Sequence, residues 1–391
     1  MHERIGNNKK LKIECLRLKG MLNIDDIQFI REMAGCYYDT KGHKYDGHLR
    51  YLDISGATLT NTDNKEVSIY PRDPSEYEGT PWPSAEAYIN DKGTPVAIFA
   101  YLYDMEEIVL PAKLKSIGDD AFIFCRSLKS INIPESVQKI GLRAFFGCSS
   151  LKSMKLPIGI TEIKSGLLSS CTNLTSIDIP YTTEEIGHNA FSKCTSLKSI
   201  ELPYSLNNMG ISVFYGCTAL TSVTIPKNIR YINDYTFYGC TGLKSLTLQE
   251  GTTDIWDYAF TDCTLLTTIT LPSTLGIICD AAFANCNSLK SIYALNPQGI
   301  GIKGKPFEEY TQSQCTLYVP EGSMYNYQCW EEWYAFNHIV EFSPTGINGV
   351  HSAAERREVE RYDTSGRRQT SPTKGLNIVR FNDGTTRKVM K

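Results

Sequence analysis

Residues 127–148 read Ser-Leu-Lys-Ser-Ile-Asn-Ile-Pro-Glu-Ser-Val-Gln-Lys-Ile-Gly-Leu-Arg-Ala-Phe-Phe-Gly-Cys, and this stretch decides the fold because its pattern recurs along the chain. Its last residue belongs to a series of eight cysteines separated by seven intervals of 23 residues. A leucine lies three residues after each cysteine, and apolar residues lie six and eight residues after it. The middle of the chain is therefore a repeat of 23 residues. The cysteines are Cys125, Cys148, Cys171, Cys194, Cys217, Cys240, Cys263 and Cys286.

The first half of each unit carries a strand signal. An alternation such as Ile131-Asn132-Ile133 is typical of a short, half-buried β-strand. A proline, here Pro134, follows in most units and ends the strand because it has no N–H to donate. A fixed spacing of about 20 to 29 residues is typical of leucine-rich-repeat solenoids. We therefore predict a protein of the α/β repeat class, a right-handed leucine-rich-repeat solenoid with a parallel β-sheet, 23-residue units, capped ends and a small C-terminal β-module.

The second half of each unit carries a small residue followed by an aromatic one. Phenylalanine fills the aromatic position in seven of eight units, and Leu167-Leu168 is the exception. Parallel strands repeat every ~4.8 Å, so like side chains lie on like. The sequence predicts a continuous aromatic spine, in which each ring buries ~150 Å² or more. The phenylalanines are Phe122, Phe145, Phe191, Phe214, Phe237, Phe260 and Phe283.

The flanks are less regular and predict four regions. Residues 1–107 form an N-terminal cap with irregular repeats, including a helix near 25–33 and a strand near 49–54. Residues 108–297 form the solenoid. Residues 298–345 form a C-terminal cap with a last strand at 316–320 and a closing region from Trp330 to Phe342. Residues 346–391 form a small basic module with a hairpin at 375–390.

Composition narrows the classes of function. The 391 residues are 41% hydrophobic and 21% charged, with a net charge of -3, which does not indicate a nucleic-acid partner. No run of apolar residues is long enough to span a bilayer. Residues 1–12 are polar and lack the apolar core of a secretory signal. As written, the chain is cytoplasmic, already processed, or begins at another start.

The cysteine series permits three interpretations. Metal binding requires four ligands converging on one point, whereas a repeat spreads its cysteines along an axis. Disulfides between neighbouring units require Cβ atoms closer than the ~4.8 Å spacing of parallel strands gives. Small buried side chains with weak donors are the interpretation we favour. The pairing of the five cysteines outside the series is left open: Cys15, Cys36, Cys279, Cys315 and Cys329.

With these columns aligned, residues 108–297 resemble the BspA-like leucine-rich-repeat family (LRR_5 type) of bacterial surface proteins. Residues 49–56 and 315–323 are similar to the caps of its Bacteroidetes members, and the tail with 362–368 is similar to short C-terminal β-modules of exported proteins in that phylum. The resemblance implies an extracellular, surface-displayed protein without catalytic motifs, some of whose relatives take part in adhesion to host proteins or other bacteria. The missing signal peptide departs from that pattern.

Aromatic side chains are concentrated on one side of the predicted repeats, where other units carry Ser, Asn, Gly or Asp. Tyrosine and tryptophan favour interfaces because they combine a large rigid surface with a polar tip. They form either a binding patch or packing on the repeat itself. Two further tyrosines follow strand-ending prolines one unit apart. The candidates are Tyr215, Tyr231, Tyr235, Tyr238, Trp256 and Tyr258, then Tyr181 and Tyr204.

The outward positions of the strands form a second candidate surface. Ser or Thr recurs from Ser130 to Ser291, either to bind an extended partner or to solubilise an open sheet face. In the next column, Asp178 and Glu201 are adjacent carboxylates, either a contact for a cationic partner or a solvated acidic spot.

Enzymatic chemistry is not indicated. The six histidines form no His-Glu-x-x-His motif, and His188 reads as a surface substitution within the repeat. No phosphate-binding glycine loop, cofactor site or metal site is predicted. The sequence therefore predicts a non-catalytic cell-surface recognition or adhesion protein with a protein or glycan partner. The alternative is an intracellular protein-interaction scaffold.

Overall fold

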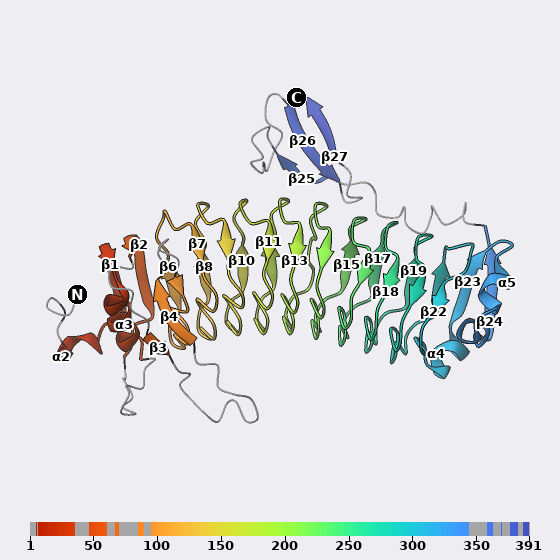
Figure 1. The fold of residues 1–391 in the computed structure, drawn as a ribbon, viewed down its shortest axis with the longest axis horizontal. Helices are drawn as coiled ribbons and strands as arrows, with labels where there is room; N and C mark the ends of the chain where they lie inside the picture. The colour runs from red at the N-terminus through yellow and green to blue at the C-terminus, as the bar shows by residue number, and fades with distance from the viewer. Residues whose placement is uncertain are drawn as a thin grey trace.

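A computed structural model describes residues 5, 7–35, 47–60, 67–69, 85–89, 95–343, 358–362, 369, 376–381 and 386–390. The central residues form an elongated parallel β-solenoid, whose turns (rungs) are stacked along one long axis (Figure 1). The described helices lie at the two ends, and the rungs between them consist of short strands and turns. The predicted solenoid with a 23-residue period is confirmed.

The Ile-x-Ile segments form a first row of parallel strands. Their register equals the sequence period, so that Ser222 pairs with Ser245 and Thr268 with Ser291. In most strands of this row the inward residues are buried and the Ser or Thr that precedes them is exposed. The row contains β1 (Cys15–Leu22), β2 (Tyr51–Leu59), β6 (Glu107–Val109), β8 (Ser130–Asn132), β10 (Ser153–Lys155), β12 (Ser176–Asp178), β15 (Ser222–Ile225), β17 (Ser245–Leu248), β19 (Thr268–Leu271), β21 (Ser291–Ala294), β23 (Thr316–Pro320) and β24 (His338–Phe342).

The first-row strand of most rungs ends at a proline such as Pro134, and we call this bend the proline corner. A second row of parallel strands, not predicted from the sequence, follows this bend. Its strands are two residues long, and in most of them the second residue is a buried Ile or Met. Ile232 pairs with Ile255, and Ile255 with Ile278. The row contains β7 (Ser116–Ile117), β9 (Lys139–Ile140), β11 (Glu162–Ile163), β13 (Glu185–Ile186), β14 (Asn208–Met209), β16 (Tyr231–Ile232), β18 (Asp254–Ile255), β20 (Ile277–Ile278) and β22 (Gly301–Ile302).

The predicted aromatic spine is present in two stacks. Phe99, Phe122 and Phe145 form the first, with ring centroids 5.3 and 5.1 Å apart. The second runs from Phe191 to Phe307, with centroids 5.1 to 5.7 Å apart. Leu168 lies between them and is fully buried. The spine is thus longer at both ends than predicted but interrupted at the rung that lacks phenylalanine.

The cysteine series forms a hydrogen-bond ladder beside the spine. The Cys217 thiol donates to the carbonyl oxygen of Phe191 at 3.1 Å, and the Cys240 thiol to that of Phe214 at the same distance. All eight thiols donate in this way to the residue 26 positions earlier. Burial raises the pKa of Cys217 and of Cys286 to about 12. The ladder cysteines are therefore buried side chains that act as weak donors, as we predicted, and they form no disulfide.

The cysteines outside the ladder are also free wherever the structure describes them. Cys15 and Cys329 are exposed, whereas Cys279 and Cys315 are buried. Cys36 lies outside the described residues.

At the N-terminal end, the first strand row continues into a β-α-β unit. Strand β1 pairs in parallel with β2, and α3 (Ile24–Met33) connects them. The Asn23 side chain accepts from the backbone N–H of Asp26, whose carboxylate accepts from that of Asn23, a capping box that fixes the helix start. The predicted helix and strand are confirmed. The other described elements here are α2 (Asn7–Lys10), β3 (Val67–Ile69), β4 (Ala85–Ile89) and β5 (Pro95–Val96).

At the other end, aromatic side chains close the spine. Trp333 is fully buried, its ring centroid lies 5.2 Å from that of Phe307, and its Nε1 donates to the carbonyl oxygen of Ile300 at 2.7 Å. The predicted strand at 316–320 is β23, and β24 adds one more parallel strand. The helices of this end are α4 (Glu309–Gln314), α5 (Met324–Gln328) and α6 (Glu331–Tyr334).

The predicted C-terminal hairpin consists of two antiparallel strands, and a third strand pairs with the first of them. The turn of the hairpin and residues 363–368 lie outside the described residues. The strands are β25 (Glu358–Tyr362), β26 (Leu376–Phe381) and β27 (Thr386–Met390). The four domain boundaries given above remain predictions.

Candidate functional site

Five of the candidate aromatic residues lie on the segments that lead from the second strand row back to the cysteines, which we call the closing turns: Tyr215, Tyr235, Tyr238, Trp256 and Tyr258. Each closing turn contains two residues with left-handed backbone, four positions apart, such as Tyr235 (φ 56°) and Gly239 (φ 69°). Asn and Gly adopt this conformation most readily. Asn189 and Gly166 accordingly occupy the first position in two rungs, whereas Tyr235 and Tyr258 (φ 58°) occupy it in two others.

Four of the six predicted aromatic residues form one surface, which we call the tyrosine patch. Tyr215 stacks on Tyr238 with ring centroids 5.1 Å apart and planes 5° apart, and Tyr235 stacks on Tyr258 at 5.0 Å and 3°. Tyr235 and Tyr238 are 5.8 Å apart and tilted, which joins the two pairs. Tyr235 is 37% exposed and the other three are half-buried. The stacked rings are partly buried, which agrees with packing on the repeat, and their role as a binding patch stays a prediction.

The other two candidates are not joined to this patch. Among the described residues, Tyr231 and Trp256 make no ring contact with another aromatic side chain. Tyr231 lies on β16, on the outer face of the second strand row, and is 47% exposed. Trp256 follows β18, and the Lys303 ammonium lies 5.9 Å from the centroid of its ring.

The remaining candidates occupy other sides of the solenoid. Tyr181 and Tyr204 lie at the proline corner, where the Ser205 hydroxyl donates to the Tyr181 carbonyl oxygen at 2.6 Å. Asp178 is in β12, and Glu201 follows one rung later on the outward face of the first row. The structure thus places these candidates on three parts of the rungs: the closing turns, the proline corner and the outward face of the first row.

Polar side chains before the left-handed positions link successive rungs. The Asp234 Oδ1 accepts from the backbone N–H of Asp257 at 3.0 Å, and the Asp257 Oδ1 accepts from that of Asp280 at 3.0 Å. His188 occupies the same column, and its Nδ1 accepts from the backbone N–H of Ile211 at 2.9 Å. His188 is exposed but is also a structural link between rungs, a role that the surface-substitution interpretation did not include.

The aspartates shape the electrostatics of the patch. The charge of the Asp262 carboxylate is the main cause of the raised pKa of Tyr238. The pKa of Tyr235 is raised first by desolvation, then by Tyr258 and by the charges of Asp234 and Asp257. The hydroxyl groups of Tyr235 and Tyr238 are therefore protonated at neutral pH, and they lie in a negative potential.

One aromatic cluster was missed in the sequence. Tyr293 stacks on Tyr318 at 4.5 Å, and Phe342 lies edge-on to Tyr293 at 5.9 Å, on the outward face of the first strand row. Tyr293 stood in the outward column, but the 25-residue step to Tyr318 departs from the repeat and hid the pairing.

No group of three or more His, Cys, Asp or Glu side chains suited to hold a metal ion occurs among the residues that the structure describes. Within the same residues, no helix is long and apolar enough to cross a bilayer.

The fold and the repeated closing turns define a leucine-rich-repeat solenoid. The sequence pattern of the BspA type leucine rich repeat region matches residues 95–221 and 207–321, more than half of the chain. The chain belongs to this BspA type family.

The chain is also similar to several solved structures. One is a leucine-rich repeat protein from Bacteroides ovatus (22% identity over 78% of this chain and 89% of that one, TM-score 0.32). Another is a leucine rich cell surface protein from Faecalibacterium prausnitzii (19% identity, 78% and 82% covered, TM-score 0.37). The pneumococcal vaccine antigen PcpA is a third such structure (19% identity, 61% and 79% covered, TM-score 0.35). No curated protein matches the chain significantly.

Proposed function

We propose that this chain is a non-catalytic recognition protein of the bacterial cell surface, and that it binds a protein or glycan partner through the tyrosine patch. The observation that carries the proposal is the pair of tyrosine stacks on adjacent closing turns. Stacked tyrosines offer a rigid contact surface with little rotamer entropy to lose on binding. Two of them, Tyr235 and Tyr258, stand at left-handed positions that favour Asn or Gly, so each tyrosine there has a local conformational cost.

A non-catalytic role is supported by the arrangement of the reactive groups. The ladder thiols are buried in the core, and Asp234 and Asp257 near the patch accept from backbone N–H groups. None of these groups offers the nucleophile, base and orienting partner that covalent catalysis needs. Membership of the BspA type family supports both a binding role and display on the surface.

The location has a direct test in the cells that make the protein. Proteinase K applied to intact cells is expected to remove the full chain, as detected by immunoblot, while a cytoplasmic marker protein survives. Degradation only after lysis would support the intracellular scaffold instead.

The patch is tested with a variant that borrows residues from other rungs of the same chain. We combine Tyr215→Ser and Tyr238→Ser, because Ser192 stands at the equivalent position, with Tyr235→Asn and Tyr258→Asn, because Asn189 does. These residues suit the local backbone, so the thermal unfolding midpoint should change little. The full chain and the variant are applied to printed arrays of glycans and of host surface proteins.

We expect the wild-type chain to bind a subset of the array and the variant to lose at least tenfold in signal on that subset, since truncated aromatic anchors at interfaces cost about 2 kcal/mol or more. The matched control outside the patch is Tyr231→Lys, chosen because Lys139 stands in the same column, and it should bind as wild type. Equal binding by the quadruple variant would remove the patch from the proposal.

A further inference from the structure

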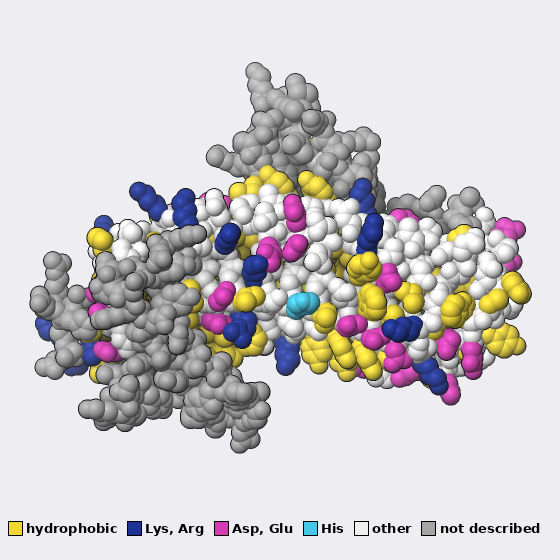
Figure 2. Space-filling view, in the orientation of Figure 1, with side chains coloured by type: hydrophobic (Ala, Val, Ile, Leu, Met, Phe, Trp, Pro, Cys, Tyr) yellow, Lys and Arg dark blue, Asp and Glu magenta, His cyan; other side chains and the backbone are white. Residues whose placement is uncertain are grey.

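The closing turns around the tyrosine patch carry charge of one sign. Residues 210–217, 233–240, 256–263 and 279–286 contain four aspartates and no lysine, arginine or glutamate. In the part of the chain that the structure describes, none of these aspartates pairs with a lysine or arginine. Figure 2 shows hydrophobic and acidic side chains together along the lower edge of the C-terminal half of the solenoid. The four are Asp234, Asp257, Asp262 and Asp280.

Their hydrogen bonds hold the carboxylates in place without cancelling their charge. Asp234, Asp257 and Asp280 each accept one backbone N–H through Oδ1, and a carboxylate has further acceptor sites. Asp262 accepts from the Asn285 amide at 2.8 Å, and its charge raises the pKa of Tyr238. A protonated tyrosine hydroxyl keeps an oxygen that can accept a hydrogen bond. The patch therefore offers acceptors and negative charge.

The tyrosine stacks leave aromatic faces at their ends. Each stack is two rings long, and the equivalent positions in the rungs before and after it hold small side chains. No large side chain of the same column covers the outer faces. The face of an aromatic ring attracts a guanidinium or ammonium group. The small residues are Ser192 and Thr261 for Tyr215 and Tyr238, and Ser212 and Ala281 for Tyr235 and Tyr258.

The chain already places one cation on a neighbouring aromatic side chain. The Lys303 ammonium lies 5.9 Å from the centroid of the Trp256 ring, which immediately precedes Asp257 in the chain. A lysine from another molecule would meet the same combination of ring and carboxylate at the patch.

From charge, acceptors and open ring faces together, we infer that the tyrosine patch binds a lysine- and arginine-bearing segment of a partner protein. This inference rests on the proposed function and names the chemistry of the partner. Arginine and lysine side chains stack on the outer ring faces and pair with Asp234, Asp257 and Asp262. A neutral glycan would gain nothing from the four negative charges.

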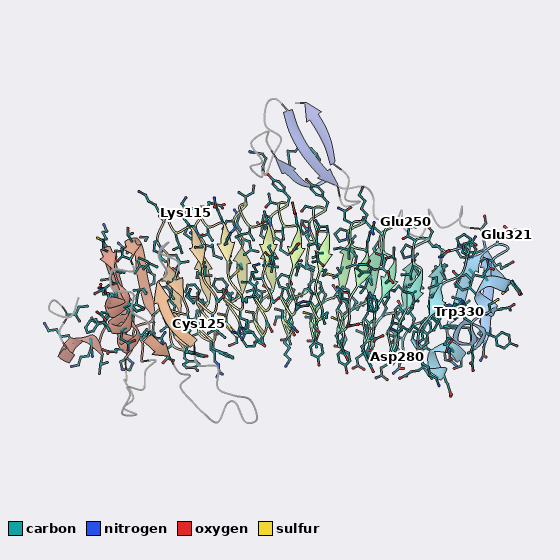
Figure 3. The ribbon with its side chains drawn as sticks, in the orientation of Figure 1. Lys115, Cys125, Glu250, Asp280, Glu321 and Trp330 are labelled. Carbon is teal, nitrogen blue, oxygen red and sulfur yellow. The ribbon has the colours of Figure 1, made fainter. Side chains whose placement is uncertain are left out.

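The experiment removes charge but keeps geometry. Asp234→Asn, Asp257→Asn and Asp262→Asn are combined, because an asparagine Oδ1 accepts the same hydrogen bonds and Asn suits the left-handed backbone of residue 262 (φ 63°). The matched control is Glu250→Gln. Glu250 also binds the next rung, at Ser273, but lies on the upper edge of the solenoid, whereas Asp280 lies on the lower edge (Figure 3).

The full-length chain and its variants are measured by biolayer interferometry on two immobilised peptides. One carries Arg and Lys in a Gly-Ser background, and the other carries citrulline and acetyl-lysine at the same positions. We expect the wild type to prefer the basic peptide and to lose affinity as NaCl is raised. The triple variant should bind it on the order of tenfold more weakly, from three exposed ion pairs, and Glu250→Gln should bind as wild type.

Equal affinity for both peptides, or a triple variant that binds the basic peptide like the wild type, would overturn the inference. The tyrosine variant separates this failure from that of the proposed function. If it loses an array partner that the triple aspartate variant retains, the patch binds a neutral ligand and only the inference falls. If it binds every probe as the wild type does, the proposed function falls as well.

Discussion

At the residue scale, the cysteine ladder shows why one residue type recurs every 23 positions. The site is fully buried beside the phenylalanine spine. It faces a carbonyl oxygen, such as that of Phe191, which accepts one backbone N–H and keeps a second lone pair for the thiol. A thiol is small, apolar and a weak donor, so it fills this site without the desolvation cost of a hydroxyl. The sequence predicted buried cysteines with weak donors, because the repeat spreads them along an axis and parallel strands keep their Cβ atoms too far apart for disulfides. The acceptor, a carbonyl oxygen 26 positions earlier, was not predicted.

The thiols should therefore differ sharply in reactivity. With N-ethylmaleimide at pH 8, we expect Cys15 and Cys329 to be modified in the native chain, because they are exposed. Cys217 and Cys286 should stay unmodified, because burial raises their pKa to about 12 and leaves almost no thiolate at pH 8.

Peptide mapping by mass spectrometry measures this difference, with the chain unfolded in guanidinium chloride as the control in which all thiols react. Modification of Cys217 as fast as Cys329 in the native chain would contradict the ladder.

At the element scale, the rung with Leu167 and Leu168 is the irregular one. Most other rungs place Ala beside Phe, and this rung replaces the pair with two leucines of intermediate size, both buried. The gap between the two ring stacks is thus filled by aliphatic side chains. Together, the two leucines fill the space that the Ala-Phe pair fills in most other rungs. The effects of substitutions at residues 167 and 168 on the free energy of unfolding should therefore not be additive.

We expect Leu168→Phe alone to lower the free energy of unfolding by about 1–3 kcal/mol, because the ring overpacks against Leu167. Adding Leu167→Ala restores the Ala-Phe pair of the neighbouring rungs and lets the new ring stack between Phe145 and Phe191, which contributes about 0.5–1.5 kcal/mol per ring pair. The double variant should recover at least the wild-type midpoint of urea unfolding. A double variant as unstable as Leu168→Phe would show that the two stacks cannot be joined.

The elements also show which parts of the fold the sequence predicts. Strands with two inward residues, such as Leu246 and Leu248 in β17, leave an alternation that can be recognised. The second strand row leaves none, because each strand has two residues and at most one of them is buried. Phe307 was not predicted as part of the spine because it follows Phe283 by 24 residues instead of 23. Its ring nevertheless continues the spine, with its centroid 5.4 Å from that of Phe283.

At the scale of the whole molecule, the 23-residue repeat predicts which side chains stack on one another in successive rungs. It does not predict which residues close in sequence lie side by side. Tyr215 and Tyr238 share a column, and so do Tyr235 and Tyr258, so each stack follows from the period. Tyr231 precedes Tyr235 by four positions but lies in β16, before the closing turn, whereas Trp256 is the first residue of its closing turn, two positions before Tyr258. Closeness in sequence therefore grouped residues that the structure places apart.

At the left-handed positions of the closing turns, the surface residue can change without a change in the backbone or the core. The backbone there is the same whether the position holds Asn189, Ser212, Tyr235 or Ala281. Exchange of such a residue changes what a visiting molecule meets while the interior stays as it was. Evolution can consequently change the binding specificity of this protein one rung at a time, by substitutions that leave the backbone of the solenoid unchanged.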